Sequence, residues 1–312
     1  MTTRPDLTPR TIAEYLDQLR AALRGADPAL IQDALYDAEE HLRAELAEQP
    51  GRSEADMLAR VVSSYGAPDE VAEIYRDQEI KIQRALRPPP VPKRRSLGGK
   101  FFGVAADPRT YSALFYMVLS LATGIFYFTW TVTGISLSLG LGVLIIGIPF
   151  IMLFFGSVRV LSLVEGRMVE SMLGVRMPRR PAFSTQGMSI WKRIGAMFTD
   201  PRSWSTLFYM LMMLPLGIIY FTLTVTLLSI SLGFTAAPLV KLVASMSGFQ
   251  DSCNGPDWVC NGILVLNGWP AAFILCIIGV LLLFTTLHMV RAIGRLHGQM
   301  AKHLLVAGAV KE

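Results

Sequence analysis

Two neighbouring cysteines are the side chains with the clearest chemical potential in this sequence. Cys253 and Cys260 are separated by six residues, within a stretch from Asp251 to Gly262 that is rich in Asn, Gly and Pro. Such a stretch closes a short loop easily, and a disulfide persists outside the reducing cytoplasm. The stretch holds no His and no third Cys, which a four-ligand zinc site would require. We therefore predict a structural disulfide, with a redox-sensing pair as the alternative.

The other reactive side chains form no catalytic motif. The sequence has no Gly-x-Ser-x-Gly elbow, no Gly-x-x-x-x-Gly-Lys-Ser/Thr phosphate loop and no His-Glu-x-x-His zinc motif. Among the four histidines, we expect His41 on a half-exposed helix face and His288 solvated near the end of an apolar segment. His297 and His303 are expected on a basic tail at the membrane surface. We therefore predict a protein that is not an enzyme and that holds no metal or cofactor.

The elements that carry these residues are mostly membrane helices. Apolar residues make up 52% of the 312 residues, which excludes disordered and secreted disulfide-scaffold proteins. Residues 111–158 contain no Asp, Glu, Lys or Arg. As one helix they would be about 72 Å long, so they must fold back across a core of about 30 Å, with a turn expected near Gly134–Gly142. From this run and two later uncharged runs we predict four spans: about 111–133, 141–160, 205–230 and 270–290.

Lys and Arg gather on one side of these spans. The residues on that side are Lys93, Arg94, Arg95, Lys100, Arg109, Arg167, Arg176, Arg179, Arg180, Lys192, Arg193, Arg202, Arg291, Arg295, Lys302 and Lys311. The two loops on the other side hold only Lys241. The positive-inside rule therefore places both termini and the long central loop in the cytoplasm.

The spans contain an internal repeat. Asp107–Gly140 aligns without a gap on Asp200–Gly233 at an offset of 93, and 21 of the 34 positions are identical. Arg159, Gly166 and Met168 match Arg291, Gly298 and Met300 at an offset of 132, so the second copy carries an insertion of 132 − 93 = 39 residues, about 234–272. We predict two hairpin repeats, about 100–175 and 193–306, in parallel orientation and related by a pseudo-two-fold axis along the membrane normal.

Each repeat opens with the same tripeptide, Asp107-Pro108-Arg109 or Asp200-Pro201-Arg202. Asp is a favourable N-cap and Pro suits the first helical turn, so we interpret the motif as a helix start. A ligand or signalling role for the two aspartates is the alternative. The aromatic residues that follow, Phe126, Tyr127, Phe128 and Trp130, are expected in an interfacial belt, with an apolar ligand pocket as the alternative.

The N-terminal part is acidic and differs from the rest. Residues 1–88 hold 17 acidic and 11 basic side chains, whereas residues 89–312 hold 7 and 18. Helical periodicity predicts four short amphipathic helices forming a small bundle in residues 1–87. A stiff Pro-rich and basic linker, 88–99, leads to the membrane domain, 100–306, and a tail, 307–312. Acidic residues on two predicted helix faces are candidates for binding a basic partner, or merely solvate those faces: Asp33, Asp37, Glu40, Glu70, Glu73 and Asp77.

Two resemblances cover nearly the whole chain. Residues 11–82, with Tyr15-Leu16-x-x-Leu19, Glu39-Glu40-His41-Leu42 and Tyr65-Gly66-x-Pro68, resemble the helical HAAS domain of bacterial signalling proteins. Residues 100–306, with the two Asp-Pro-Arg motifs and Gly147-Ile-Pro149, resemble the "putative sensor" membrane domain of some sensor histidine kinases. The resemblance implies signalling in a bacterial inner membrane, and HAAS-type proteins are often encoded beside PadR-like repressors. After the last span about 20 residues remain, which is too few for a kinase, so the output is expected through the N-terminal helical domain or another protein.

The fold class we predict is therefore all-α: a small helical bundle plus a four-helix membrane domain. As function we predict a multi-pass membrane sensor that couples a membrane or envelope stimulus to a cytoplasmic regulator. The regulator we expect is a transcriptional one, a PadR-like repressor or similar. The bilayer is the second partner, direct nucleic-acid binding is not expected, and a homo-oligomer is compatible with the sequence. A transporter or transport-accessory protein is the alternative, disfavoured by spans without charges. A membrane assembly or scaffold protein is the second alternative.

Overall fold

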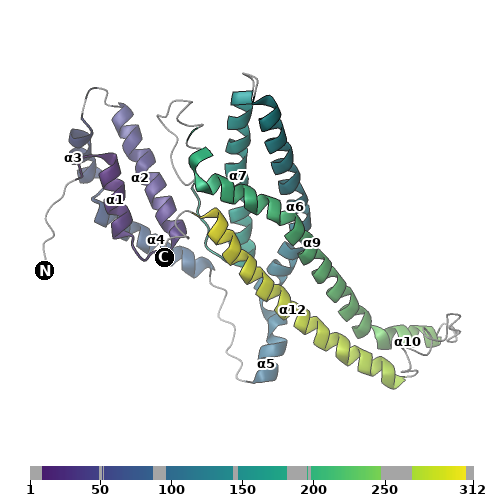
Figure 1. The fold of residues 1–312 in the computed structure, drawn as a ribbon. Coiled ribbons are helices and arrows are strands. Elements are labelled where there is room, and N and C mark those ends of the chain that lie inside the picture. Colours follow the sequence, from purple (N-terminus) through teal and green to yellow (C-terminus); the bar gives the residue numbers. More distant parts are fainter. Residues whose placement is uncertain are drawn as a thin grey trace. The chain divides into compact units, whose positions relative to one another are not determined.

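The computed structural model of the protein describes residues 9–48, 51, 53–86, 96–142, 147–180, 195, 198–246 and 269–306. These residues form ten α-helices and one short 3-10 helix, with no strand among them, so the predicted all-α class is confirmed (Figure 1). The chain divides into two compact units. Unit 1 comprises Met1–Pro89, Phe126–Met212 and Arg295–Glu312, and unit 2 comprises Pro90–Ile125 and Met213–Gly294.

The N-terminal part of unit 1, which we call the head, has the four predicted helices. They are α1 (Ile12–Ala22), α2 (Pro28–Glu48), α3 (Glu54–Ser64) and α4 (Pro68–Leu86). Polar side chains begin three of them: Thr11 Oγ1 accepts from the Glu14 amide, Asp27 Oδ1 from Ala29, and Ser53 Oγ from Asp56. The local sequence therefore sets where the head helices start.

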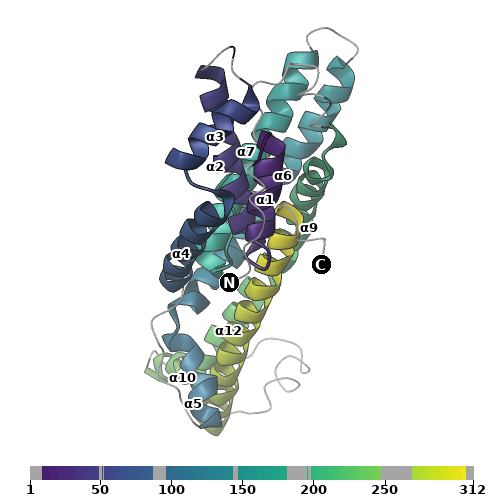
Figure 2. The same cartoon turned by 90° about the vertical axis from the view of Figure 1, so that its left-hand side faces the viewer.

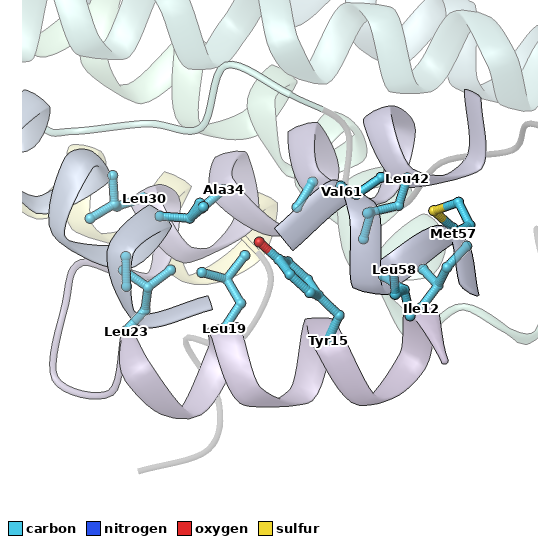
Figure 3. Packing of buried hydrophobic residues seen from close by; sticks show 13 residues of the cluster. Ile12, Tyr15, Leu19, Leu23, Leu30, Ala34, Leu42, Met57, Leu58 and Val61 are labelled. Atoms are coloured by element: carbon cyan, nitrogen blue, oxygen red, sulfur yellow. The ribbon is translucent and has the colours of Figure 1, made fainter. Parts of the chain in front are cut away.

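The head encloses its own apolar core (Figure 3). α1 packs against α2 and α4, and α2 also packs against α3. The core side chains from α1, α2 and α3 are Ile12, Tyr15, Leu19, Leu30, Ala34, Leu42, Met57, Leu58 and Val61, with Leu23 just after α1. Tyr15 is completely buried, and its hydroxyl donates to the Gly66 carbonyl oxygen at 2.9 Å, which ties α1 to the turn before α4.

We expect Tyr15→Phe to lower the free energy of opening the head by about 1 kcal/mol, because the half-buried Gly66 carbonyl loses its donor while the ring still fills the core. Amide hydrogen exchange of α1 in the full chain should then accelerate about fivefold. Tyr36→Phe is the control, since Tyr36 lies outside the core cluster. Equal exchange rates in Tyr15→Phe and the unchanged protein would show that this hydrogen bond does not contribute to the stability of the head.

Four helices are long and apolar enough to cross a membrane, so the four predicted spans are confirmed. They are α6 (Pro108–Leu141), α7 (Gly147–Leu173), α9 (Pro201–Thr235) and α12 (Trp269–Leu305). Shorter elements accompany them: α5 (Leu97–Phe102) and the 3-10 helix η1 (Gly103–Ala106) precede α6, and α10 (Ala237–Met246) follows α9.

The helices extend beyond the predicted spans. α6 stays helical to Leu141 and the turn begins at Gly142, so it lies at the end of the predicted range Gly134–Gly142 and not within it. In an apolar environment the backbone N–H and C=O groups have no water to bind, and a helix pairs them with one another. This gain outweighs the weak helix propensity of Gly and Ser. α7 continues 13 residues past the predicted end at 160, to Leu173, and therefore includes Glu165 and Glu170. This extension lies beyond the predicted span, so the prediction of charge-free spans stays a prediction.

Within unit 1 each pair of consecutive long helices is in contact. Trp130 Nε1 of α6 donates to Ser157 Oγ of α7 at 2.9 Å, and Ser205 Oγ of α9 donates to the Leu304 carbonyl of α12 at 2.8 Å. The C-terminal half of α6 lies beside α7 in both Figure 1 and Figure 2. These contacts fit two hairpins.

In unit 2 the two repeats meet through equivalent glycines. A Cβ on Gly124 would collide with the Met213 backbone, and a Cβ on Gly217 would collide with the Ser120 backbone. Both pairs of equivalent positions, 124 with 217 and 120 with 213, differ by 93. Such a reciprocal contact is typical of a two-fold relation. The parallel orientation of the repeats and the predicted domain boundaries stay predictions.

Candidate functional site

The repeated Asp-Pro-Arg motifs have the geometry of helix starts. Asp107 Oδ1 accepts from the Arg109 amide at 3.0 Å, and Asp200 Oδ1 accepts from the Arg202 amide at 3.1 Å. In unit 2, Asp107 Oδ2 also pairs with Arg291 Nη2 of α12 at 2.8 Å. Asp107 thus caps the start of its own helix and forms an ion pair with a helix of the second repeat.

A buried carboxylate lies inside unit 1. Glu165 of α7 is 1% exposed, and its oxygens accept from Tyr127 Oη of α6 at 3.0 Å and from Tyr209 Oη of α9 at 2.8 Å. Tyr209 Oη is also 3.1 Å from His297 Nε2 of α12. Because Tyr209 donates its proton to Glu165, we infer that His297 Nε2 carries the proton donated to Tyr209. The cluster therefore takes one side chain from each membrane helix.

Glu165 and His297 occupy equivalent positions of the two repeats, since 297 − 165 = 132 is the offset already found for the neighbouring glycines. An acid in one copy thus faces a base in the other. An ionisable side chain buried in a membrane helix is costly, and such residues usually serve a function. The sequence prediction missed this pair because it ended the spans before both residues. Extending the 132-residue alignment one position before Gly166 would have found it.

The chain leaves α7 through a segment that packs beside this cluster. Gly174, with φ of 70°, ends the helix, and we call residues 175–180 the strap. A Cβ on Gly298 would collide with Val175, and Gly166 faces Met177 at ordinary contact distance. Gly166 and Gly298 directly follow Glu165 and His297 in sequence. The strap therefore packs on the two helices at the level of the buried cluster.

The other face of the strap binds the head through a buried arginine. Arg176 is 6% exposed and pairs with Asp33 of α2 at 3.1 Å, Glu79 of α4 at 3.2 Å and Glu170 of α7 at 3.5 Å. Its Nη1 also donates to the Met177 carbonyl. Burial by itself lowers the pKa of Arg176, but Glu79 and Asp33 raise it above its ordinary value. One cation thus joins three buried carboxylates from three helices.

Asp33 also receives backbone hydrogen bonds from the strap. Its Oδ1 accepts from the amides of Arg179 at 2.6 Å and Arg180 at 2.8 Å. Burial raises the pKa of Asp33, and these two amides together with Arg176 oppose that rise. Gln32 Nε2 donates to the Arg180 carbonyl at 2.7 Å, and Arg180 Nε pairs with Asp37 at 2.8 Å. The strap thus covers this face of α2.

Two family models match the chain. Residues 116–305 match the model described as "Putative sensor", and residues 14–74 match the model of the HAAS domain. The first match covers more than half of the chain. The protein belongs to the "Putative sensor" family. Both predicted resemblances are confirmed, in the predicted order. No curated protein and no solved structure matches the chain.

The sensor domain contains the whole buried cluster, whereas the HAAS domain supplies the head side of the strap contact. Glu165, Tyr127, Tyr209 and His297 all lie within the residues matched by the sensor family. Asp33 lies within the HAAS match, and Glu79 lies just after its end. The ion pairs of Arg176 with Asp33, Glu79 and Glu170 therefore connect the HAAS domain to the sensor domain.

Two of the histidines, His297 and His288, differ from their predicted settings, whereas His41 agrees with its own. The prediction that His297 lies on a surface tail is wrong, because it is 1% exposed and contacts Tyr209. His288 was expected to be solvated, but its ring stacks on Phe101 and its Nε2 lies 3.1 Å from the Phe101 carbonyl. His41 stacks on Tyr65 on a half-buried helix face, as predicted.

The aromatic residues of α6 separate into two groups. Phe126 and Trp130 are 50% and 42% exposed, which suits the predicted belt. Tyr127 is 3% exposed and bonds Glu165, so its assignment to that belt is wrong. The belt expectation failed there because adjacent residues of a helix point in different directions.

Of the predicted partner-binding acids, the structure leaves only the α4 group on the surface of the head. Asp33 is 6% exposed and Asp37 is half-buried, so the prediction of an open acidic face on α2 is wrong. Glu40 is also half-buried. Glu70, Glu73 and Asp77 are exposed, and Glu70 accepts from the Ala67 amide at the start of α4.

The cysteine prediction falls outside the part of the chain that is described. Cys253 and Cys260 lie in 247–268, and the Pro-rich spacer in 87–95, so both stay predictions. Cys276 in α12 is a half-buried free thiol. Within the described ranges, no group of three or more His, Cys, Asp or Glu side chains is placed to hold a metal ion.

Proposed function

We propose that this protein is a non-enzymatic sensor that couples a membrane or envelope stimulus to a cytoplasmic transcription regulator through its head. It lies in the inner membrane of a bacterium, with both termini and the strap in the cytoplasm. The one-sided distribution of Lys and Arg supports this orientation. The two family matches support the sensor role.

The observation that carries the proposal is the double attachment of the strap. One side packs on α7 and α12 beside Glu165 and His297, and the other binds the head through Arg176. A shift of either helix at that level would displace the strap. Displacement would change the buried ion pairs with Asp33 and Glu79, and hence the position or mobility of the head.

The exposed face of α4 is the surface that we assign to the regulator. Glu73 and Asp77 are exposed on it, next to Ile74, which is 53% exposed, and Ile80, which is 56% exposed. A partner with a basic rim around an apolar contact would complement this face. PadR-like repressors, which the HAAS resemblance implies as partners, are DNA-binding proteins and therefore have such positive surfaces.

We expect the full chain in phosphatidylcholine nanodiscs to bind a purified PadR-like regulator encoded beside it. The double variant Glu73→Lys, Asp77→Lys should weaken that binding at least about tenfold, because its new positive charges repel the basic surface of the regulator. Biolayer interferometry at two salt concentrations measures the affinity. Asp17→Lys with Glu48→Lys is the matched control, since it changes the head's charge equally at exposed sites elsewhere. Absent binding, or equal weakening in the control, would count against this surface.

A further inference from the structure

A pocket lies within unit 1 where the strap meets α7 and the start of α9. It encloses about 620 Å³ of space, part of it open to solvent. Its walls come from four places: Phe155–Gly166 of α7, Asp200–Thr206 at the start of α9, Met177 and Pro178 of the strap, and Leu305 of α12. Gln32 of the head completes the lining.

The polar part of the lining favours an anion. Arg159 and Arg202 bring two positive charges, and Asp200 brings one negative charge, part of which is engaged by the Arg202 amide. The net charge of the lining is therefore +1. Ser162, Ser203 and Thr206 add hydroxyl donors. Guanidinium and hydroxyl groups together suit a phosphate or carboxylate.

The remaining lining favours an alkyl chain. Apolar side chains from three segments form it: Phe155, Val158, Leu163, Met177 and Leu305. A pocket with an apolar body and a few convergent polar groups is typical of small-molecule sites. We propose that this pocket binds an anionic amphiphile, with its phosphate or carboxylate between Arg159 and Arg202 and its alkyl chain against α7.

An amphiphile in this pocket touches the strap and the head directly. It contacts Met177 and Pro178, and it contacts Gln32, whose amide holds the Arg180 carbonyl at 2.7 Å. Occupancy therefore changes the contact between strap and head. This consequence rests on the proposed function, whereas binding itself does not.

The test uses the full chain in phosphatidylcholine nanodiscs, titrated with dodecyl phosphate and followed by native mass spectrometry. Arg159→Gln and Arg202→Gln should each weaken binding about ten- to a hundredfold, because each removes a charge-assisted hydrogen bond. Arg109→Gln is the matched control, since Arg109 is the repeat equivalent of Arg202 and does not line the pocket. Arg109→Gln should bind as the unchanged protein does, and Arg159→Lys, which keeps the charge, should lose less than Arg159→Gln.

Further arms separate the chemistry and the source of the ligand. Inorganic phosphate and dodecanol should each bind much more weakly than dodecyl phosphate, because each carries half of the recognised chemistry. Phosphatidylglycerol in the nanodisc should compete with dodecyl phosphate if the ligand is a membrane lipid, and should not compete if it is a free amphiphile. Unchanged affinity in both Gln variants, or inorganic phosphate binding as tightly as dodecyl phosphate, overturns the proposal.

The effect on the head is measured separately. Gln32→Cys with Arg180→Cys should form a disulfide, since these residues are in contact, and dodecyl phosphate should change its yield. Binding without any change in this yield would leave the pocket established and would contradict the coupling of the proposed function. The two failures are thus distinguishable.

Discussion

Arg176→Leu is expected to weaken the attachment of the head to the strap by about 3–5 kcal/mol, the usual result of removing one partner from a buried ion pair. Asp33, Glu79 and Glu170, whose side chains are 6–8% exposed, would then lose the cation between them. Burying mutually repelling carboxylates costs more than the lost attraction alone. The head should therefore separate from the strap while its own core, built from other residues, stays folded.

Hydrogen exchange in the full chain measures this result. Amides at the strap side of α2 and α4 should exchange faster in Arg176→Leu, whereas amides of α1 should keep their protection. Arg180→Leu is the matched control, because its ion pair with Asp37 is 51% and 30% exposed and is expected to contribute only about 0–1 kcal/mol. The backbone bonds that Arg180 makes to Asp33 and Gln32 remain in this control.

A second change distinguishes charge from packing. Adding Asp33→Asn and Glu79→Gln to Arg176→Leu removes two of the stranded charges, so part of the protection should return. Protection that stays low would show that the guanidinium acts through its shape and hydrogen bonds. Protection that is unaffected by Arg176→Leu itself would remove the strap from the proposed signalling route.

The sequence was sufficient for the features that depend on local pattern. Charge-free runs longer than a bilayer needs predicted four spans, and the repeated motifs beginning at Asp107 and Asp200 predicted helix starts. Helical periodicity predicted four amphipathic helices in the head, and their apolar side chains, such as Tyr15, Leu19 and Leu42, form its core. Each of these signals lies within one helix, where a 3.6-residue period relates spacing to burial.

The features that sequence reasoning missed depend on residues far apart in the chain. Asp33 and Arg176 are 143 positions apart, and no periodicity connects them, so the acidic face of α2 was interpreted as open. Glu165 was missed because a charged residue was taken to end a span. A buried carboxylate is tolerated there because Tyr127 and Tyr209 donate to it, and those donors come from other helices.

The buried cluster gives the second large prediction. Glu165→Leu removes the acceptor to which both tyrosine hydroxyls donate. Tyr127 Oη then loses its acceptor, which costs about 1–3 kcal/mol for a buried hydroxyl, whereas Tyr209 Oη keeps its contact with His297 Nε2. We therefore expect the full chain in nanodiscs to lose several degrees of thermal stability. Glu165→Gln keeps one acceptor oxygen and nearly the same shape, so it should lose less.

A double-mutant cycle isolates the hydrogen bond itself. Tyr127→Phe alone should destabilise the protein, but in the Glu165→Leu background it should change little, because its partner is already gone. Tyr111→Phe is the control, since Tyr111 is an exposed tyrosine of the same helix, α6. Additive losses in the cycle would mean that Tyr127 and Glu165 stabilise the membrane helices independently. A coupling term of about 1 kcal/mol or more would instead establish the carboxylate as the common acceptor that joins α6 to α7, beside the glycines on which the strap rests.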